Sequence, residues 1–93
     1  MLYVYVLKSE FMKEIYIGST NDLRRRLREH NSKLEISTKR YAPWSVYYYE
    51  AYLTEKLARI REKRLKNNGN AIRELKKRIG LLYNKKGFTQ RHF

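Results

Sequence analysis

The sequence contains no cysteine, one proline and four glycines among its 93 residues. Without cysteine, the chain can form neither a disulfide nor a thiolate metal site. Its longest apolar run, residues 2–7, is far shorter than the roughly 20 residues of a membrane helix, and it has neither the charged start nor the cleavage site of a signal peptide. We therefore expect a cytoplasmic protein without a membrane partner.

Acidic residues are also scarce. Nine Asp and Glu face 22 Lys and Arg, which gives a formal net charge of +13. A charge of this size draws a protein to a polyanion, because binding releases counterions. A surface built only for solubility usually mixes both signs, at a net charge of about 2 to 8. The charge therefore favours nucleic acid as the partner.

The length of the chain allows one hydrophobic core and is too short for two. Hydrophobic residues make up 42% of the sequence, which is enough to fill one core. The periodic apolar pattern covers residues 1–80, which we expect to form a single domain. Residues 81–93 lack a clear pattern and are expected to form a flexible C-terminal tail.

Three segments rich in β-branched and aromatic residues predict strands. Residues 2–7 (LYVYVL) and 14–17 (EIYI), separated by a short polar stretch, predict an antiparallel hairpin whose second strand ends at Gly18. Residues 45–52 (SVYYYEAY) predict a third strand, whose consecutive tyrosines must alternate between the two faces of the sheet. The expected sheet is small, three-stranded and mostly antiparallel.

Three segments predict helices, because apolar residues recur at helical spacing after capping side chains or a breaker. Between the first helix and the third strand, residues 32–41 predict a loop with room for a short helix. The order β-β-α-(short α)-β-α-α predicts an α/β fold of the α+β type, with helices flanking the sheet. The long helices are expected at residues 22–31, at residues 54–66, and from the breaker 67–70 (NNGN) to Gly80.

The first helix places an arginine and a histidine together. Leu23 and Leu27 mark its buried side, and Arg26 and His30 fall just beside that stripe, in i, i+4 register. Spacing alone favours a structural interpretation, with a snorkelling arginine and a satisfied boundary histidine. The other arginines of the helix are expected to point away from the core: Arg24, Arg25 and Arg28.

The second long helix is expected to pack through Leu57, Ala58 and Leu65, which leaves Glu62 at the rim of that face. A rim carboxylate can reach a cation, and a hard-cation site needs only one or two carboxylates. On helical spacing alone, Glu62 is expected to pair with a neighbouring cation such as Lys66.

The nine tyrosines are a high count for 93 residues, and most are expected in the core, on the sheet or stacked on bases. Tyr5 and Tyr16 differ from the others in their position. They lie on paired strands of a tight hairpin, which can bring them close together on one face, and Gly18 lets a backbone approach just beyond.

Taken in order, these residues resemble the GIY-YIG nuclease superfamily. The resemblance covers about residues 2–80 and is closest to small, stand-alone members that are similar to the catalytic domain of a bacterial excision-repair subunit. Stretches of that kind are YIGSTNDLRRRLREHN and YYYEAYLTE. Tyr3 stands where the family's first motif has glycine. The ordered set is Tyr3-Val4-Tyr5, Tyr16-Ile17-Gly18, Arg26, His30 and Glu62.

The resemblance implies a metal-dependent endonuclease that hydrolyses phosphodiester bonds in DNA. Tyr5 and Tyr16 would be the motif tyrosines, one acting with a bound water as general base. Arg26 would steady the phosphate, His30 would orient a tyrosine or relay a proton, and Glu62 would hold one divalent metal, Mg²⁺ or else Mn²⁺. These residue types supply the base, the cation and the leaving-group assistance that hydrolysis needs.

The resemblance also implies supporting residues and partners. Ser19 and Thr38 occupy places where family members put further polar active-site groups. DNA rather than RNA would be the substrate, in DNA repair, and a protein partner would supply specificity. The surface cations expected to bind nucleic acid are Arg24, Arg25, Arg28, Lys76 and Lys77.

Two other functions stay open on the sequence. The same scaffold and basic surface would serve a non-catalytic nucleic-acid-binding module, because a fold does not establish an activity. A structural or assembly role on an RNA-rich particle would use Arg and Lys to neutralise phosphate and tyrosines to stack on exposed bases.

Overall fold

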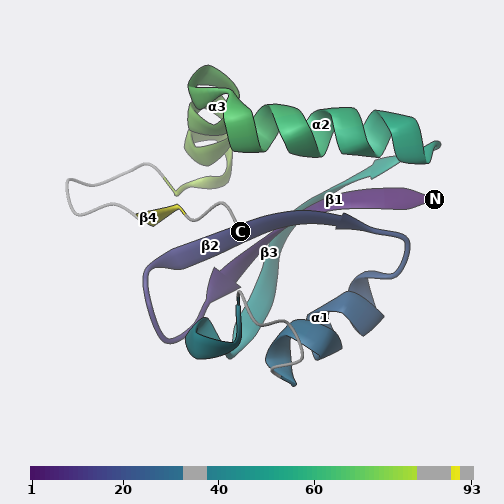
Figure 1. Ribbon diagram of the computed structural model, residues 1–93. Helices are drawn as coiled ribbons and strands as arrows, with labels where there is room; N and C mark the ends of the chain where they lie inside the picture. The colour runs from purple at the N-terminus through teal and green to yellow at the C-terminus, as the bar shows by residue number, and fades with distance from the viewer. Residues whose placement is uncertain (33–37, 82–88, 91–93) are drawn as a thin grey trace.

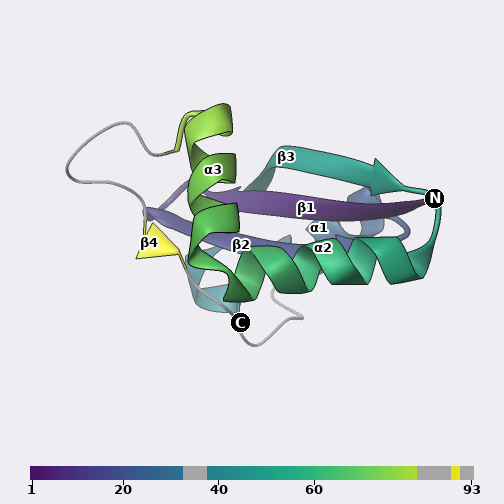
Figure 2. The same cartoon turned by 90° about the horizontal axis from the view of Figure 1, so that it is seen from above.

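A central β-sheet separates helix α1 (Leu23–Asn31) on one face from helices α2 (Glu55–Asn67) and α3 (Gly69–Ile79) on the other (Figure 1). Seen from above, α2 runs along the strands and α3 turns across them (Figure 2). This computed structural model describes residues 1–32, 38–81 and 89–90. No helix in these ranges combines the length and apolarity needed to cross a bilayer.

The sheet has the strand order β3-β1-β2-β4. β1 (Leu2–Ser9) pairs antiparallel with β2 (Glu14–Thr20), as the sequence predicts, and on its other side with β3 (Trp44–Tyr52), also antiparallel. A two-residue strand, β4 (Thr89–Gln90), pairs in parallel with the start of β2. The predicted α+β fold is confirmed, with β4 as a short addition to the three expected strands.

β4 lies in the segment that was expected to be an unpatterned tail. The rest of that segment, residues 82–88 and 91–93, lies outside the described residues. The short helix expected within residues 32–41 is the 3-10 turn η1 (Lys39–Tyr41).

Capping side chains set where the helices begin. Asp22 and Thr54 each accept a hydrogen bond from a backbone N–H in the first turn of α1 and α2, at 3.0 and 3.2 Å. Asn68 ends α2 and also caps α3, which begins at Gly69. The break between the two helices is therefore one residue long, not the four residues predicted at 67–70. Gly80 ends α3 with a φ of 83°, in the left-handed conformation that favours glycine.

The two faces of the sheet bury different side chains, because successive residues of a strand point to opposite faces. The face under α2 and α3 is aliphatic, and the face toward α1 is mainly aromatic and carries hydroxyl groups. The aliphatic cluster comprises Val4, Val6, Ile15, Ile17, Ala58, Leu65, Ile72, Leu75 and Leu81. The aromatic cluster comprises Tyr5, Leu7, Tyr16, Tyr41 and Trp44.

Two expectations about packing are wrong. Leu57 is 49% exposed, because α2 meets the sheet through Ala58 and Leu65, both fully buried. Gly18 does not end the second strand, since it pairs with β1 within the ladder and β2 continues to Thr20.

A carboxylate ties α2 to β3. Glu50 accepts two hydrogen bonds from Arg61, at 2.9 Å each, and one each from the hydroxyls of Tyr48 and Tyr52, at 2.7 and 2.6 Å. Burial acts to raise the pKa of Glu50, but these hydrogen bonds outweigh it and lower that pKa to about 2. The bidentate pair therefore stays charged well into the acid range.

The Glu50–Arg61 ion pair makes the free energy of unfolding depend on pH in the acid range. The pKa of Glu50 falls from 4.5 to about 2 on folding, so ionised Glu50 contributes stability that is present above pH 4.5 and lost as the pH falls toward 2. We expect Glu50→Gln to lower the free energy of unfolding at neutral pH and to flatten its decline in that window. Chemical denaturation along a pH series measures both effects, with Glu10→Gln at an exposed site as control. An unchanged acid dependence would contradict the assignment.

Candidate active site

The two motif tyrosines lie side by side on the α1 face of the hairpin. Their ring centroids are 6.1 Å apart, as the hairpin geometry predicts. Tyr5 is opposite Gly18 in the ladder, and a Cβ at Gly18 would lie 2.5 Å from the Tyr5 hydroxyl oxygen and 3.0 Å from Cε2 of Tyr16. Glycine at this position therefore makes the space that the Tyr5 ring occupies.

A buried chain of hydrogen bonds runs from Tyr5 through His30 to Thr38. The Tyr5 hydroxyl lies 3.2 Å from Nε2 of His30, and Nδ1 of His30 lies 2.7 Å from Oγ1 of Thr38. None of the three residues is more than 1% exposed. His30 is thus not the boundary residue that helical spacing predicts, because its ring also packs on Tyr16, with centroids 4.7 Å apart.

The surroundings of Tyr5 keep it protonated. Burial, reinforced by the neighbouring Tyr16, raises the pKa of the Tyr5 phenol well above its ordinary value, whereas Arg26 acts to lower it. The Arg26 guanidinium, which hydrogen-bonds to Tyr5, is thus the cation beside the phenol, and the hydroxyl also lies 3.2 Å from Nε2 of His30.

Arg26 connects this buried chain to the surface. Its Nη1 donates to Oε1 of Glu29 at 2.9 Å, and its side chain is 22% exposed. The guanidinium therefore touches Tyr5 on one side and solvent on the other, where it can meet an anion.

Glu62 reaches the same edge of the sheet from the opposite layer. Its Oε1 accepts from the Ser19 hydroxyl at 2.6 Å and its Oε2 accepts from Nζ of Lys66 at 2.7 Å. The expected pairing with Lys66 is confirmed, and the Glu62 side chain is 19% exposed, which fits a rim position. Nζ of Lys66 also lies 5.7 Å from the ring centroid of Tyr16, so Lys66 joins Glu62 to the tyrosines.

Arg26 and Glu62 line two adjacent surface depressions that share Arg59 and lie along α2, the edge of β2 and the start of α1. We call the two together the β2 groove. Its walls are basic but contain carboxylates, so they can attract a polyanion and still present an acidic ligand. The first part of the groove is lined by residues that include Ser19, Arg25, Arg26, Glu29, Glu55 and Arg59. The second part shares Arg59 and adds Glu62, Lys63, Lys66 and Asn67.

Arg59 was missed as a site residue, although the sequence contains a signal for it. It lies three residues before Glu62, so it falls on the same flank of α2. Glu55 holds its guanidinium in place through hydrogen bonds of 2.8 and 3.0 Å. Lys66, expected only as a partner for Glu62, belongs to the groove for the same reason.

The surface cations predicted to bind nucleic acid are scattered. Only Arg25 lines the β2 groove, while Arg24 lines a separate depression beside β3. Arg28 is exposed and lines neither, and Lys77 is likewise exposed on α3. Burial lowers the pKa of Lys76, which is only partly accessible. Charge alone therefore does not locate the site.

Glu62 provides a small donor set for a metal ion. In the described part of the chain no group of three or more His, Asp or Glu side chains could hold one. Mg²⁺ often binds to one or two carboxylates, with water and substrate phosphates completing its coordination. Glu62, oriented by Ser19, fits this minimal requirement once the Lys66 ammonium leaves Oε2.

Gly18→Ala tests the contact between the tyrosines and the backbone. The added Cβ would clash with two buried rings, so we expect a loss of about 1–3 kcal/mol in the free energy of unfolding. Gly69→Ala is the matched control, because a Cβ there meets nothing within 4 Å and should leave stability unchanged or raise it by about 0.4–1 kcal/mol. Urea denaturation compares the two variants, and equal stabilities would contradict the clash.

The family model described as the GIY-YIG catalytic domain matches residues 1–79. A UPF0213 protein from Bacillus pumilus (strain SAFR-032) is 42% identical over 65 residues, which cover 69% of this chain and 65% of that protein. The structure-specific endonuclease subunit slx1 from Schizosaccharomyces japonicus (strain yFS275 / FY16936) is 36% identical over 61 residues, which cover 62% of this chain and 22% of that protein.

No solved structure matches the chain. The aligned part is less than two thirds of the length of either relative. The match over residues 1–79 nevertheless extends through all three long helices and the three long strands. The chain belongs to the GIY-YIG catalytic domain family.

Proposed function

We propose that the protein is a metal-dependent endonuclease that hydrolyses phosphodiester bonds in DNA. The main support is the hydrogen-bonded chain Tyr5–His30–Thr38, which approaches the β2 groove through Arg26. Membership of the GIY-YIG family and the likeness to a structure-specific endonuclease subunit add support from comparison. The basic walls of the groove are suited to a phosphate backbone.

In this proposal Tyr5 relays a proton. Its hydroxyl takes a proton from the attacking water as it passes its own proton to Nε2 of His30. Because Tyr5 is neutral before and after the transfer, its raised pKa does not prevent the step. Thr38, whose Oγ1 lies 2.7 Å from Nδ1, would accept the Nδ1 proton of His30, so that Nε2 can receive the proton from Tyr5.

Arg26 and Glu62 act on the phosphate side of the reaction. Arg26 would donate to the non-bridging oxygens, where negative charge increases in the transition state. Glu62 would hold one Mg²⁺, or else Mn²⁺, with its carboxylate oriented by Ser19. Such an ion, when bound, supplies Lewis-acid stabilisation of the phosphate and the leaving oxygen.

A non-catalytic nucleic-acid-binding module is the second candidate. One observation favours it: both carboxylate oxygens of Glu62 already have partners, Ser19 and Lys66, at 2.6 and 2.7 Å. In either case we propose that a protein partner supplies specificity, because the aligned region covers only 22% of a relative that is itself named as a subunit.

Nicking of supercoiled plasmid and cutting of branched DNA at low salt, with Mg²⁺ or EDTA, test the enzyme. We expect Tyr5→Phe, His30→Gln and Glu62→Gln each to lose about 10²-fold or more in rate while DNA binding persists, because each removes a proton-relay or charge-stabilising group. Tyr49→Phe is the matched control, since Tyr49 is 54% exposed and lines a different depression. Cutting by the parent in EDTA, or by Tyr5→Phe at the parent rate, would contradict the mechanism.

Lys66→Met tests whether Glu62 holds the metal in the proposed enzyme. If Lys66 competes with the metal for Glu62, its removal should lower the Mg²⁺ concentration for half-maximal cutting by about fivefold, since a partly exposed ion pair is worth up to about 1 kcal/mol. Cleavage rates along a Mg²⁺ titration measure the shift. Complete loss of cutting at every Mg²⁺ concentration would instead identify Lys66 as the essential cation and remove the argument for a metal at Glu62.

A further inference from the structure

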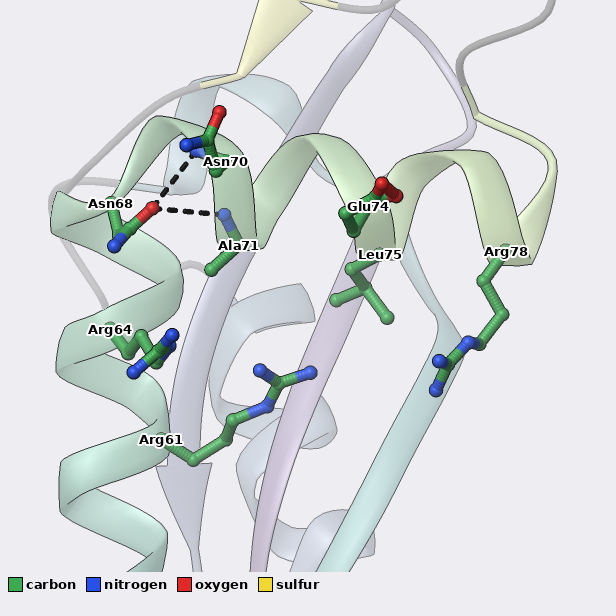
Figure 3. Close-up of a pocket in the computed structure, with 8 residues that line it drawn as sticks. All are labelled: Arg61, Arg64, Asn68, Asn70, Ala71, Glu74, Leu75 and Arg78. Carbon is green, nitrogen blue, oxygen red and sulfur yellow. Dashed lines mark hydrogen bonds between the residues drawn. The ribbon is translucent and has the colours of Figure 1, made fainter.

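A second concave surface lies between α2 and α3, which we call the α2–α3 pocket (Figure 3). It shares no lining residue with either part of the β2 groove. Its polar lining residues are Arg61, Arg64, Asn68, Asn70, Glu74 and Arg78. Three guanidinium groups thus gather at a place that the proposed chemistry does not use.

Arg61 is held rigidly within this pocket. Its Nε and Nη2 donate to Glu50, and Glu50 also accepts from the hydroxyls of Tyr48 and Tyr52. The carboxylate is therefore saturated by its own neighbours, and the Nη1 group of Arg61 is left to face an anion. A guanidinium fixed in this way loses little conformational entropy when it binds.

Arg64 and Arg78 complete the pocket from its two sides. Arg61 and Arg64 extend from α2 and Arg78 extends from α3 toward the same space (Figure 3). Both Arg64 and Arg78 are exposed, and neither forms an ion pair within the described part of the chain. Like charges brought together repel one another, and an anion between them relieves the repulsion.

The remaining lining adds little negative charge. The carboxylate of Glu74 lies 3.8 Å from Nζ of Lys77, which offsets it. Oδ1 of Asn68 already accepts hydrogen bonds from the first backbone N–H groups of α3, those of Asn70 and Ala71, at 2.9 and 3.0 Å. The guanidiniums, rather than the helix end, therefore define what this pocket can bind.

We infer that the α2–α3 pocket binds a backbone phosphate of the nucleic acid that occupies the β2 groove. Guanidinium groups match phosphate oxygens in bidentate geometry. The apolar lining consists of Ala71 and Leu75, so a free mononucleotide would find no aromatic face for its base. The inference rests on nucleic acid being the partner but does not require cleavage.

α2 lies between the two surfaces, so the pocket holds a flanking phosphate and not the one that is cut. Glu62 and Lys66 line the groove on one flank of α2, and Arg61 and Arg64 line the pocket on the other. A helix with its side chains is about 10–12 Å across, which corresponds to the axial rise of about three base pairs of a duplex, at about 3.4 Å each. The pocket thereby orients the backbone relative to the groove.

Binding of a fluorescent DNA duplex in EDTA, measured along a salt series, tests this inference without any need for cutting. The test variant is the double substitution Arg64→Gln and Arg78→Gln. The control is Lys56→Gln with Arg73→Gln, which removes the same charge from exposed positions on the same helices outside the pocket. Since each phosphate contact contributes about 0.9 to the slope of log K against log salt, the test variant should lose about one unit of slope and the control much less.

Equal slopes for the two double variants would overturn the inference. A separate titration of the parent with inorganic phosphate distinguishes the source of the phosphate. Suppose that the double variant Arg64→Gln, Arg78→Gln loses saturable binding of inorganic phosphate while its salt slope for DNA stays that of the parent. That result would assign the pocket to a free anion and would also refute the inference. If the parent never cuts DNA but the test variant still loses about one unit of salt slope relative to it, the proposed catalysis fails while the phosphate site in the α2–α3 pocket is supported.

Discussion

The candidate site depends on the close approach of the Tyr5 ring to the backbone of Gly18. Any side chain at Gly18 would enter the space of the Tyr5 hydroxyl, so the absence of one allows the phenol to lie flat against β2. In that position the Tyr5 hydroxyl lies 3.2 Å from Nε2 of His30, which comes from α1, and Thr38 contacts the other ring nitrogen at 2.7 Å. The absence of a Cβ at Gly18 therefore makes room for the tyrosine that begins the hydrogen-bonded series Tyr5–His30–Thr38.

The alternation of the β-strand places the site across an edge rather than on one face. Gly18 faces α1 together with the tyrosines, whereas its neighbour Ser19 faces α2 and donates to Glu62. Two layers that the sheet otherwise separates therefore contribute to one groove. The aliphatic face under α2 and α3 can be optimised for packing, while the aromatic face carries polar groups whose burial is tolerated because they are hydrogen-bonded to one another.

Local sequence patterns predicted the strands and helices well, because alternation, helical spacing and capping depend only on residues close in sequence. The ordered motif residues also led to Tyr5, His30 and Glu62. Tertiary contacts explain what was missed. The exposure of Leu57 depends on how α2 is rotated against the sheet, the burial of His30 depends on the space beside Tyr16, and β4 is too short to leave any pattern. The α2–α3 pocket exists only because α3 turns across α2.

Charge is distributed differently on the two sides of α2, and this difference separates binding from chemistry. In the β2 groove Arg26, Arg59 and Lys66 each contact a carboxylate, at 2.7 to 2.9 Å. Under the proposed function, a phosphate entering there would have to displace those carboxylates, so the groove would contribute less to affinity than its count of cations implies. In the α2–α3 pocket the one strong ion pair serves to orient Arg61, and Arg64 and Arg78 remain for the ligand. Under the proposed function, attraction to the nucleic-acid backbone would therefore come mainly from outside the groove, and the ion pairs inside it would rearrange when a phosphate reaches them.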